Sequence, residues 1–184
     1  MERINLGTWI EQTISNFGAN RIGDKPPVFV MISAMTDVAW HDRSLKEFVR
    51  IFLYECLLTN DPDAAMEVSV RNRGQLKDLA EFVGVRPSYW VQLRISGRGL
   101  RLFERLVEDL FADVGYRCQE WVGVEHSCAR LGIFTAHKNP GLKIVFCLEI
   151  SRHILKCDLL LPVFETFPVP CLIPDGVKHE PPRT

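Results

Sequence analysis

The sequence has no run of about 18 apolar residues, the length that a helix needs to cross a bilayer. Its first residues, MERINLGTWIEQ, lack the basic region and the uninterrupted apolar run of a signal peptide. The six cysteines include no Cys-x-x-Cys pair, and most lie in apolar runs such as IVFCLEI, which is typical of buried thiols in a reducing compartment. We therefore expect a cytoplasmic protein with no membrane partner and no disulfide framework.

A strong charge of either sign is also missing. The 22 basic and 23 acidic residues leave a net charge of −1, so the whole chain has no general attraction to nucleic acid or to anionic lipid. With 184 residues, of which 47% are hydrophobic, the chain is long enough to bury a core without disulfides or metals. Any charged partner must therefore bind a local patch.

Signatures of catalysis are scarce. The sequence lacks Gly-x-Ser-x-Gly and the Lys-Ser/Thr of a phosphate loop, although SGRG at 96–99 before a helical run is able to hold an anion. His126, Cys128, Cys118 and His137 are zinc-ligand types without standard spacing, and a polar turn with buried thiols explains them better. We expect no cofactor and no resident metal, and an enzyme is the least favoured class.

The character of the chain changes near residue 115. Residues 4–17 and 44–59 carry apolar side chains at helical spacing, which predicts two amphipathic helices. Beyond residue 115, four β-rich runs are joined by short polar links, which favours an antiparallel meander over 116–167. Residues 168–184 form a Pro-rich tail. These features predict a mainly helical part over 1–115 and a β part after it.

The segment LAEFVGVRPSYWVQLRISGRG, residues 79–99, allows two interpretations. As a strand, SYWVQLRI is rich in residues that favour pleated surfaces, and it places Tyr89 and Leu93 on one face. As a helix pair, QLKDLAEFVG forms a first helix that ends at Gly84, and Pro87 falls in the first turn of a second helix. The helical interpretation explains more residues, and we favour it.

The order of residues in LAEFVGVRPSYWVQL resembles the helix-turn-helix of Cro/repressor-type DNA-binding proteins. The common form of that family is Leu-Ala-Glu, two variable residues, Gly-Val, one variable residue, Pro-Ser-Tyr and a later Leu. The resemblance spans residues 79–93 and implies a second helix that enters the major groove of DNA. The matching positions are Leu79, Ala80, Glu81, Gly84, Val85, Pro87, Ser88, Tyr89 and Leu93.

The charge of the surrounding segment agrees with that resemblance. Residues 71–105 carry eight basic and three acidic side chains, a local net charge of +5, and seven of the eight are arginines. Arginine favours bidentate contacts to phosphate or guanine. An alternative is a solvated arginine-rich face that binds an acidic protein. Under the helical interpretation, the DNA-binding residues are Arg71, Arg73, Arg86, Ser88, Tyr89, Gln92, Arg94, Arg98 and Arg101.

These observations predict an α+β fold with helical N-terminal two thirds, a helix-turn-helix-like segment at 75–96 and an antiparallel β-meander in the last third. The function that follows is a DNA-binding transcriptional regulator, which we expect to be a homodimer because one short recognition helix gives limited specificity. The alternative is a non-catalytic protein-interaction or assembly factor whose arginine-rich face binds an acidic partner.

Overall fold

The computed structural model describes residues 2–19, 27–33, 36–40 and 43–164; the Pro-rich tail predicted at 168–184 lies outside them. The elements in chain order are β1 (Glu2–Asn5), α1 (Leu6–Ala19), β2 (Val28–Ile32), β3 (Asp37–Trp40), α2 (Arg43–Thr59), β4 (Met66–Asn72), α3 (Lys77–Val83), β5 (Tyr89–Arg98), α4 (Glu104–Asp113), β6 (Tyr116–Gly123), β7 (Ala129–Ala136), β8 (Lys143–Ser151) and β9 (Ile154–Val163).

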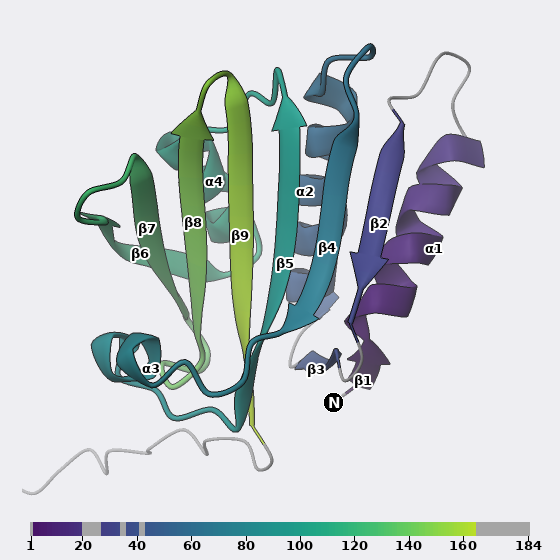
Figure 1. The fold of residues 1–184 in the computed structure, drawn as a ribbon. Coiled ribbons are helices and arrows are strands. Elements are labelled where there is room, and N and C mark those ends of the chain that lie inside the picture. The colour runs from purple at the N-terminus through teal and green to yellow at the C-terminus, as the bar shows by residue number, and fades with distance from the viewer. Residues whose placement is uncertain (1, 20–26, 34–35, 41–42, 165–184) are drawn as a thin grey trace, which may run out of the picture.

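In the described part of the chain, seven strands form one sheet in the order β2-β4-β5-β9-β8-β7-β6. β2 runs parallel to β4, and the other neighbours are antiparallel. β1 and β3 pair with each other in a small separate ladder. The sheet therefore places β5, from the middle of the sequence, directly beside β9, the last strand in chain order (Figure 1).

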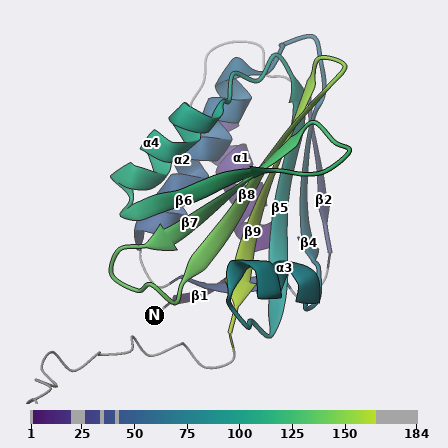
Figure 2. The same cartoon turned by 90° about the vertical axis from the view of Figure 1, so that its left-hand side faces the viewer.

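Helices α1, α2 and α4 lie on one face of the sheet, whereas α3 lies at one end of the strands on the other face (Figures 1 and 2). The core between helices and sheet is built around Phe111 of α4. Its ring stacks on Phe48 of α2, with centroids 3.9 Å apart, and on Phe134 of β7, with centroids 4.0 Å apart. Phe52 and Phe146 meet edge to face beside it. These aromatic contacts hold α2 and α4 to the C-terminal strands.

The prediction that the first two thirds are helical is wrong. Residues 66–72 and 89–98 are strands, and β5 is hydrogen-bonded on both sides in the middle of the sheet. The expected second helix of the helix-turn-helix-like segment is therefore absent. Trp90 and Leu93, which a helix would place on one face, lie on opposite faces of β5, and both are fully buried.

The physical reason lies in the burial pattern of β5. Val91, Leu93 and Ile95 point toward the helices and are fully buried, whereas the polar residues between them point to the opposite face. Trp90, near the start of the strand, is fully buried on that opposite face, so its spacing of three residues from Leu93 imitates one face of a helix. Gly84 does end a helix in the left-handed conformation, with φ of 73°, but Pro87 then precedes a strand instead of opening a second helix.

The predicted simple meander is also wrong for the sheet as a whole. β6 to β9 pair antiparallel in chain order, but β9 continues onto β5 and β4, and the ladder ends with the parallel strand β2. The four late strands form no layer of their own. They are one part of a mixed sheet whose remaining strands come from the first hundred residues.

We expect Leu93→Ala to lower the free energy of unfolding by about 2 to 5 kcal/mol, because it opens a cavity on the helix-covered face of the central strand. Urea unfolding followed by circular dichroism measures this change. Arg98→Ala, at the exposed end of the same strand, should change stability by less than about 0.5 kcal/mol. A small loss for Leu93→Ala would contradict the placement of β5.

Candidate partner-binding surface

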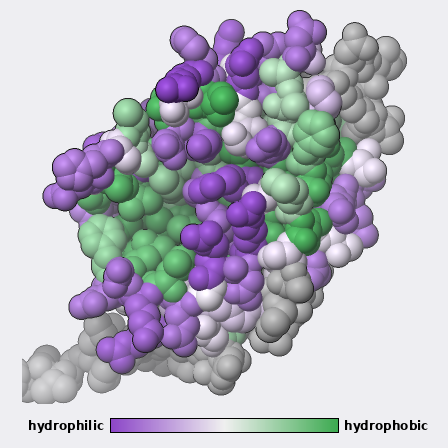
Figure 3. All heavy atoms as spheres, viewed as in Figure 1, coloured by the Kyte–Doolittle hydropathy of each residue, from purple (hydrophilic) through white to green (hydrophobic). Residues whose placement is uncertain are grey.

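The sheet face opposite α1, α2 and α4 has polar side chains along its middle. Arg94 of β5 lies in register with Asp158 of β9 on one side and with Ser69 of β4 on the other. Figure 3 shows a hydrophilic band over the middle of this face, with hydrophobic surface on both sides. On β2, Phe29 and Met31 are 60% and 48% exposed. The face thus offers the polar and apolar contacts that protein interfaces combine.

Arg94 and Asp158 form a bidentate ion pair that joins β5 to β9. Arg94 Nε and a terminal nitrogen of its guanidinium donate to the two carboxylate oxygens of Asp158 at 2.6 and 2.7 Å. The hydrogen bond that Arg94 donates to Asp158 raises the pKa of Arg94, against the opposing effect of desolvation. The positive charge of Arg94 is therefore satisfied within the sheet, which leaves it poorly suited to holding a phosphate.

The residues predicted to bind DNA lie in three separate places. Gln92 and Arg94 are in the middle of the open face, and Gln92 is buried. Arg98 and Arg101 are exposed beyond the far end of β5. Near α3 lie Arg71, Arg73, Arg86, Ser88 and Tyr89. Because an extended chain rises about 3.3 Å per residue, the two ends of β5 are about 30 Å apart. The structure therefore gathers into one surface only the residues near α3.

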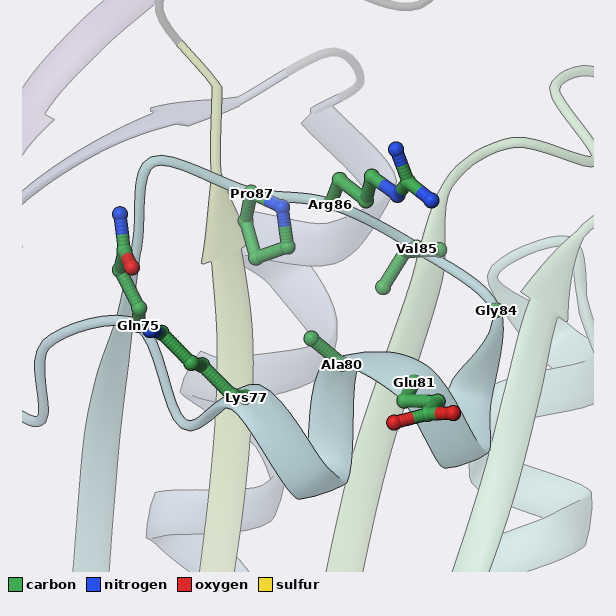
Figure 4. Close-up of a pocket in the computed structure, with 8 residues that line it drawn as sticks. All are labelled: Gln75, Lys77, Ala80, Glu81, Gly84, Val85, Arg86 and Pro87. Carbon is green, nitrogen blue, oxygen red and sulfur yellow. The ribbon is translucent and has the colours of Figure 1, made fainter.

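A hollow of about 710 Å³ lies between α3 and the chain that returns to the sheet (Figure 4). Lys77 stands at one end of this hollow and Arg86 at the other, with the small side chain of Ala80 between them. Glu81 lies at its outer side, on the helix. Lys77 and Arg86 are exposed, and neither forms an ion pair with another residue that the structure describes.

Backbone geometry shapes this hollow. Leu76, before the first turn of α3, has a left-handed conformation with φ of 40°, which is costly for a residue with a Cβ. At the other end, Gly84 is left-handed, and the N–H groups of Gly84 and Val85 donate to Ala80 O. Lys143 Nζ donates to Val83 O at 2.9 Å and ties the end of α3 to β8. The helix is thereby fixed over the sheet.

The surface around α3 is cationic. Residues 71–87 carry four basic and two acidic side chains, and Lys143 adds a fifth cation. In the same segment Phe82 is 52% exposed. We call this set the α3 surface; it consists of Arg71, Arg73, Lys77, Phe82, Arg86 and Lys143.

Sequence reasoning named three of the arginines on the α3 surface but missed Lys77, Phe82 and Lys143. Lys77 belongs to the basic segment but is not among the predicted DNA-binding residues. Phe82 is exposed on α3. Lys143 reaches α3 from a strand 60 residues later in the chain. No local signal in the sequence predicts that contact, because it depends on the pairing of β8 with β9.

The candidate zinc ligands are not brought together. His126 and Cys128 lie in the turn before β7, whereas His137 follows β7 at its other end, and Cys118 is on the edge strand β6. Among the described residues, no group of three or more His, Cys, Asp and Glu side chains is arranged to hold a metal ion. Within the same residues, no helix is both long and apolar enough to span a membrane.

Comparison with known proteins places the chain in no family. No protein-family model matches it, and no curated protein matches it. A solved structure titled "Mycobacterial sensor histidine kinase MprB" aligns with 12% sequence identity and a TM-score of 0.47, covering 89% of this chain and 97% of that chain. A likeness at this level defines neither a family nor an activity for the present chain.

We expect the ion pair of Arg94 and Asp158 to stabilise the sheet modestly. In a double-mutant cycle with Arg94→Ala and Asp158→Ala, the coupling free energy should be about 1 kcal/mol, because the geometry is bidentate but Arg94 is 42% exposed. Urea unfolding of the two single variants and of the double variant measures it. Additive losses would show that the pair contributes nothing beyond packing.

Two thiols should make stability fall at alkaline pH. Burial raises the pKa of Cys147 to about 11 and that of Cys118 to about 11, from an ordinary value of 9.0. Because the folded chain keeps these protons longer, their stabilising contribution is complete below about pH 9 and is lost as the pH rises through 11. Urea unfolding between pH 8 and 11 should therefore show a shallower decline for the Cys118→Ser/Cys147→Ser variant. Equal slopes would contradict this assignment.

Proposed function

We propose that this protein is a non-catalytic interaction or assembly factor whose α3 surface binds an acidic segment of a partner protein. The observation that supports this function best is a hollow of about 710 Å³ flanked by Lys77 and Arg86, in a segment (71–87) that carries four basic and two acidic side chains. A carboxylate-rich segment complements that charge, and electrostatic complementarity gives an interface both partner selection and a fast association rate.

The shape of the α3 surface supports a peptide segment as the ligand. Ala80 and Gly84 leave space between the helix and the returning chain, and Lys77 and Arg86 flank that space. The exposed ring of Phe82 lies on the same short helix and offers an aromatic anchor. The partner segment that fits this arrangement carries several Asp or Glu residues and at least one apolar side chain.

DNA binding stays a prediction. We favour an acidic protein because of where the proposed base-reading residues lie. Gln92 is buried in the sheet, and Tyr89 is half-buried on the helix-covered side of β5. Arg98 and Arg101, proposed for phosphate contacts, lie at the opposite end of β5 from Arg86. To contact all of these residues, a DNA duplex would have to reach both ends of β5, which lie about 30 Å apart.

We further propose a cytoplasmic location. Burial raises the pKa of Cys56, Cys118, Cys147 and Cys157, so these thiols stay protonated and unreactive near neutral pH. All the cysteines that the structure describes are free, which suits a reducing compartment. The predicted homodimer was tied to DNA binding, and it too stays a prediction.

The test is a titration with a fluorescein-labelled decapeptide that contains Asp, Glu and two Leu residues. We expect Lys77→Glu/Arg86→Glu to weaken binding about tenfold or more, because each lost contact costs about 0.5 to 1 kcal/mol and 1.4 kcal/mol corresponds to a factor of ten. Fluorescence anisotropy at two salt concentrations measures the dissociation constant. Binding to the wild-type chain should weaken as salt rises.

Arg98→Glu/Arg101→Glu is the matched control, because it makes the same charge change at the other end of β5. It should leave peptide binding unchanged. A peptide with Asn and Gln in place of Asp and Glu should not bind. A 20-base-pair duplex that binds more tightly than the acidic peptide, with loss on Arg98→Glu/Arg101→Glu, would overturn the proposal in favour of DNA.

A further inference from the structure

The two outer strands of the sheet differ in how they are protected. β6 has an irregular register between Cys118 and Glu120, and it carries exposed charges on Arg117 and Glu120. Bulges and charges of this kind discourage pairing with another strand. β2, with the sequence VFVMI, has no charged residue and no register shift in its pairing with β4. The β2 edge therefore lacks the protection that the β6 edge has.

The backbone of β2 shows which groups this edge offers. Pro27 O accepts from Met66 N at 2.8 Å, and Ser33 N donates to Val70 O at 2.9 Å, so the odd-numbered residues direct their backbone groups toward β4. The N–H and C=O groups of Val28, Val30 and Ile32 consequently point away from the sheet. Within the described residues they have no backbone hydrogen-bond partner.

A hollow of about 360 Å³ lies beside this edge, between β2 and α1. Val28 and Val30 form its wall on the strand, and Ile14 and Phe17 form its wall on α1. Leu57 of α2 also lines it. A hollow with apolar side chains on both walls, next to unpaired backbone groups, matches the mode in which an extended peptide adds a strand to a sheet beside a helix.

We propose that the β2 edge binds an extended segment of a partner protein as an additional strand. Backbone groups of the segment pair with Val28, Val30 and Ile32. Every second side chain of the segment is apolar and enters the hollow between β2 and α1, since side chains alternate along a strand. The alternate side chains on the opposite face pack beside exposed Phe29 and Met31.

The charge of the hollow indicates which charged residue the bound segment carries. Among the described residues that line the hollow, Glu11 is the charged one, and it is exposed. The segment therefore carries a Lys or Arg that reaches Glu11. This requirement argues against a second copy of the chain, because VFVMI has no cation to offer. The β2 edge and the α3 surface have opposite charge preferences, so this site is independent of the proposed function.

The test uses the full chain and the synthetic heptapeptide Lys-Thr-Val-Thr-Val-Thr-Val, with acetylated and amidated ends, so that the Lys and the Val side chains share the face that enters the hollow. Amide resonances of Val28, Val30 and Ile32 are followed by NMR during titration, and we expect them to shift saturably. Val30→Pro should weaken binding at least tenfold, because it removes an outward N–H while leaving the ladder to β4 intact. Val30→Thr, which keeps the N–H and the shape, is the matched control and should bind.

A second variant tests the charge requirement, and it keeps the proposal testable if Val30→Pro does not fold. Glu11→Lys should weaken the Lys peptide and strengthen a peptide with Glu in the same place. Lys77→Glu/Arg86→Glu should bind the heptapeptide as wild type does, which separates this site from the α3 surface. The proposal is overturned by no saturable shift at millimolar peptide, or by equal binding of folded Val30→Pro. It is also overturned if the same amides shift with protein concentration alone, since that would identify a second copy as the occupant.

Discussion

The pairing of β5 with β9 is the contact on which the rest of the molecule depends. It runs over ten residue pairs, from Tyr89 opposite Val163 to Arg98 opposite Ile154, and it joins a strand from the middle of the sequence to the last strand of the sheet. Without it the sheet would separate into β2-β4-β5 and β9-β8-β7-β6. Arg94 and Asp158 meet in the middle of this ladder. A slip of β9 by one residue would turn Asp158 toward the helix-covered core and leave Arg94 without its partner, so the ion pair favours the observed register.

Because three helices are packed on one face of this sheet, the surfaces available to partners lie elsewhere. The stack of Phe111 between Phe48 and Phe134 commits α2 and α4 to the helix-covered face. Of the helices in the described residues, α3, with its seven residues, lies on the opposite face, and Lys143 holds its end. What remains is an open central band, a cationic end around α3, and an uncharged edge at β2. The unequal covering of the two faces thus creates three surfaces of different chemistry.

Sequence patterns predicted the amphipathic helices well. The apolar spacing at 4–17 and 44–59 corresponds to α1 and α2, and Gly84 ends α3 as its residue type predicts. The failure at 87–96 has a definite cause: the alternation of apolar and polar residues over 91–96 does indicate a strand, but Trp90 is buried on the opposite face from Leu93, so the pair mimicked one face of a helix. The order of strands was beyond reach because the neighbour of β5 lies more than 50 residues later in the chain.

The same error explains the dispersal of the arginine-rich surface. A helix rises about 1.5 Å per residue, so Arg86 and Arg98 would lie about 18 Å apart on one. On an extended chain their separation roughly doubles. The positive charge of segment 71–105 is therefore divided between two ends of the sheet, with Arg94 neutralised between them. The basic residues that the helical interpretation placed on one face are therefore divided. The α3 surface lies at one end of the sheet, and Arg98 lies at the other. The segment proposed for the β2 edge carries a cation, whereas the segment proposed for the α3 surface is acidic, so the two proposed sites have unlike ligands. That division suits a protein that joins partners more than one that reads a regular, uniformly anionic duplex.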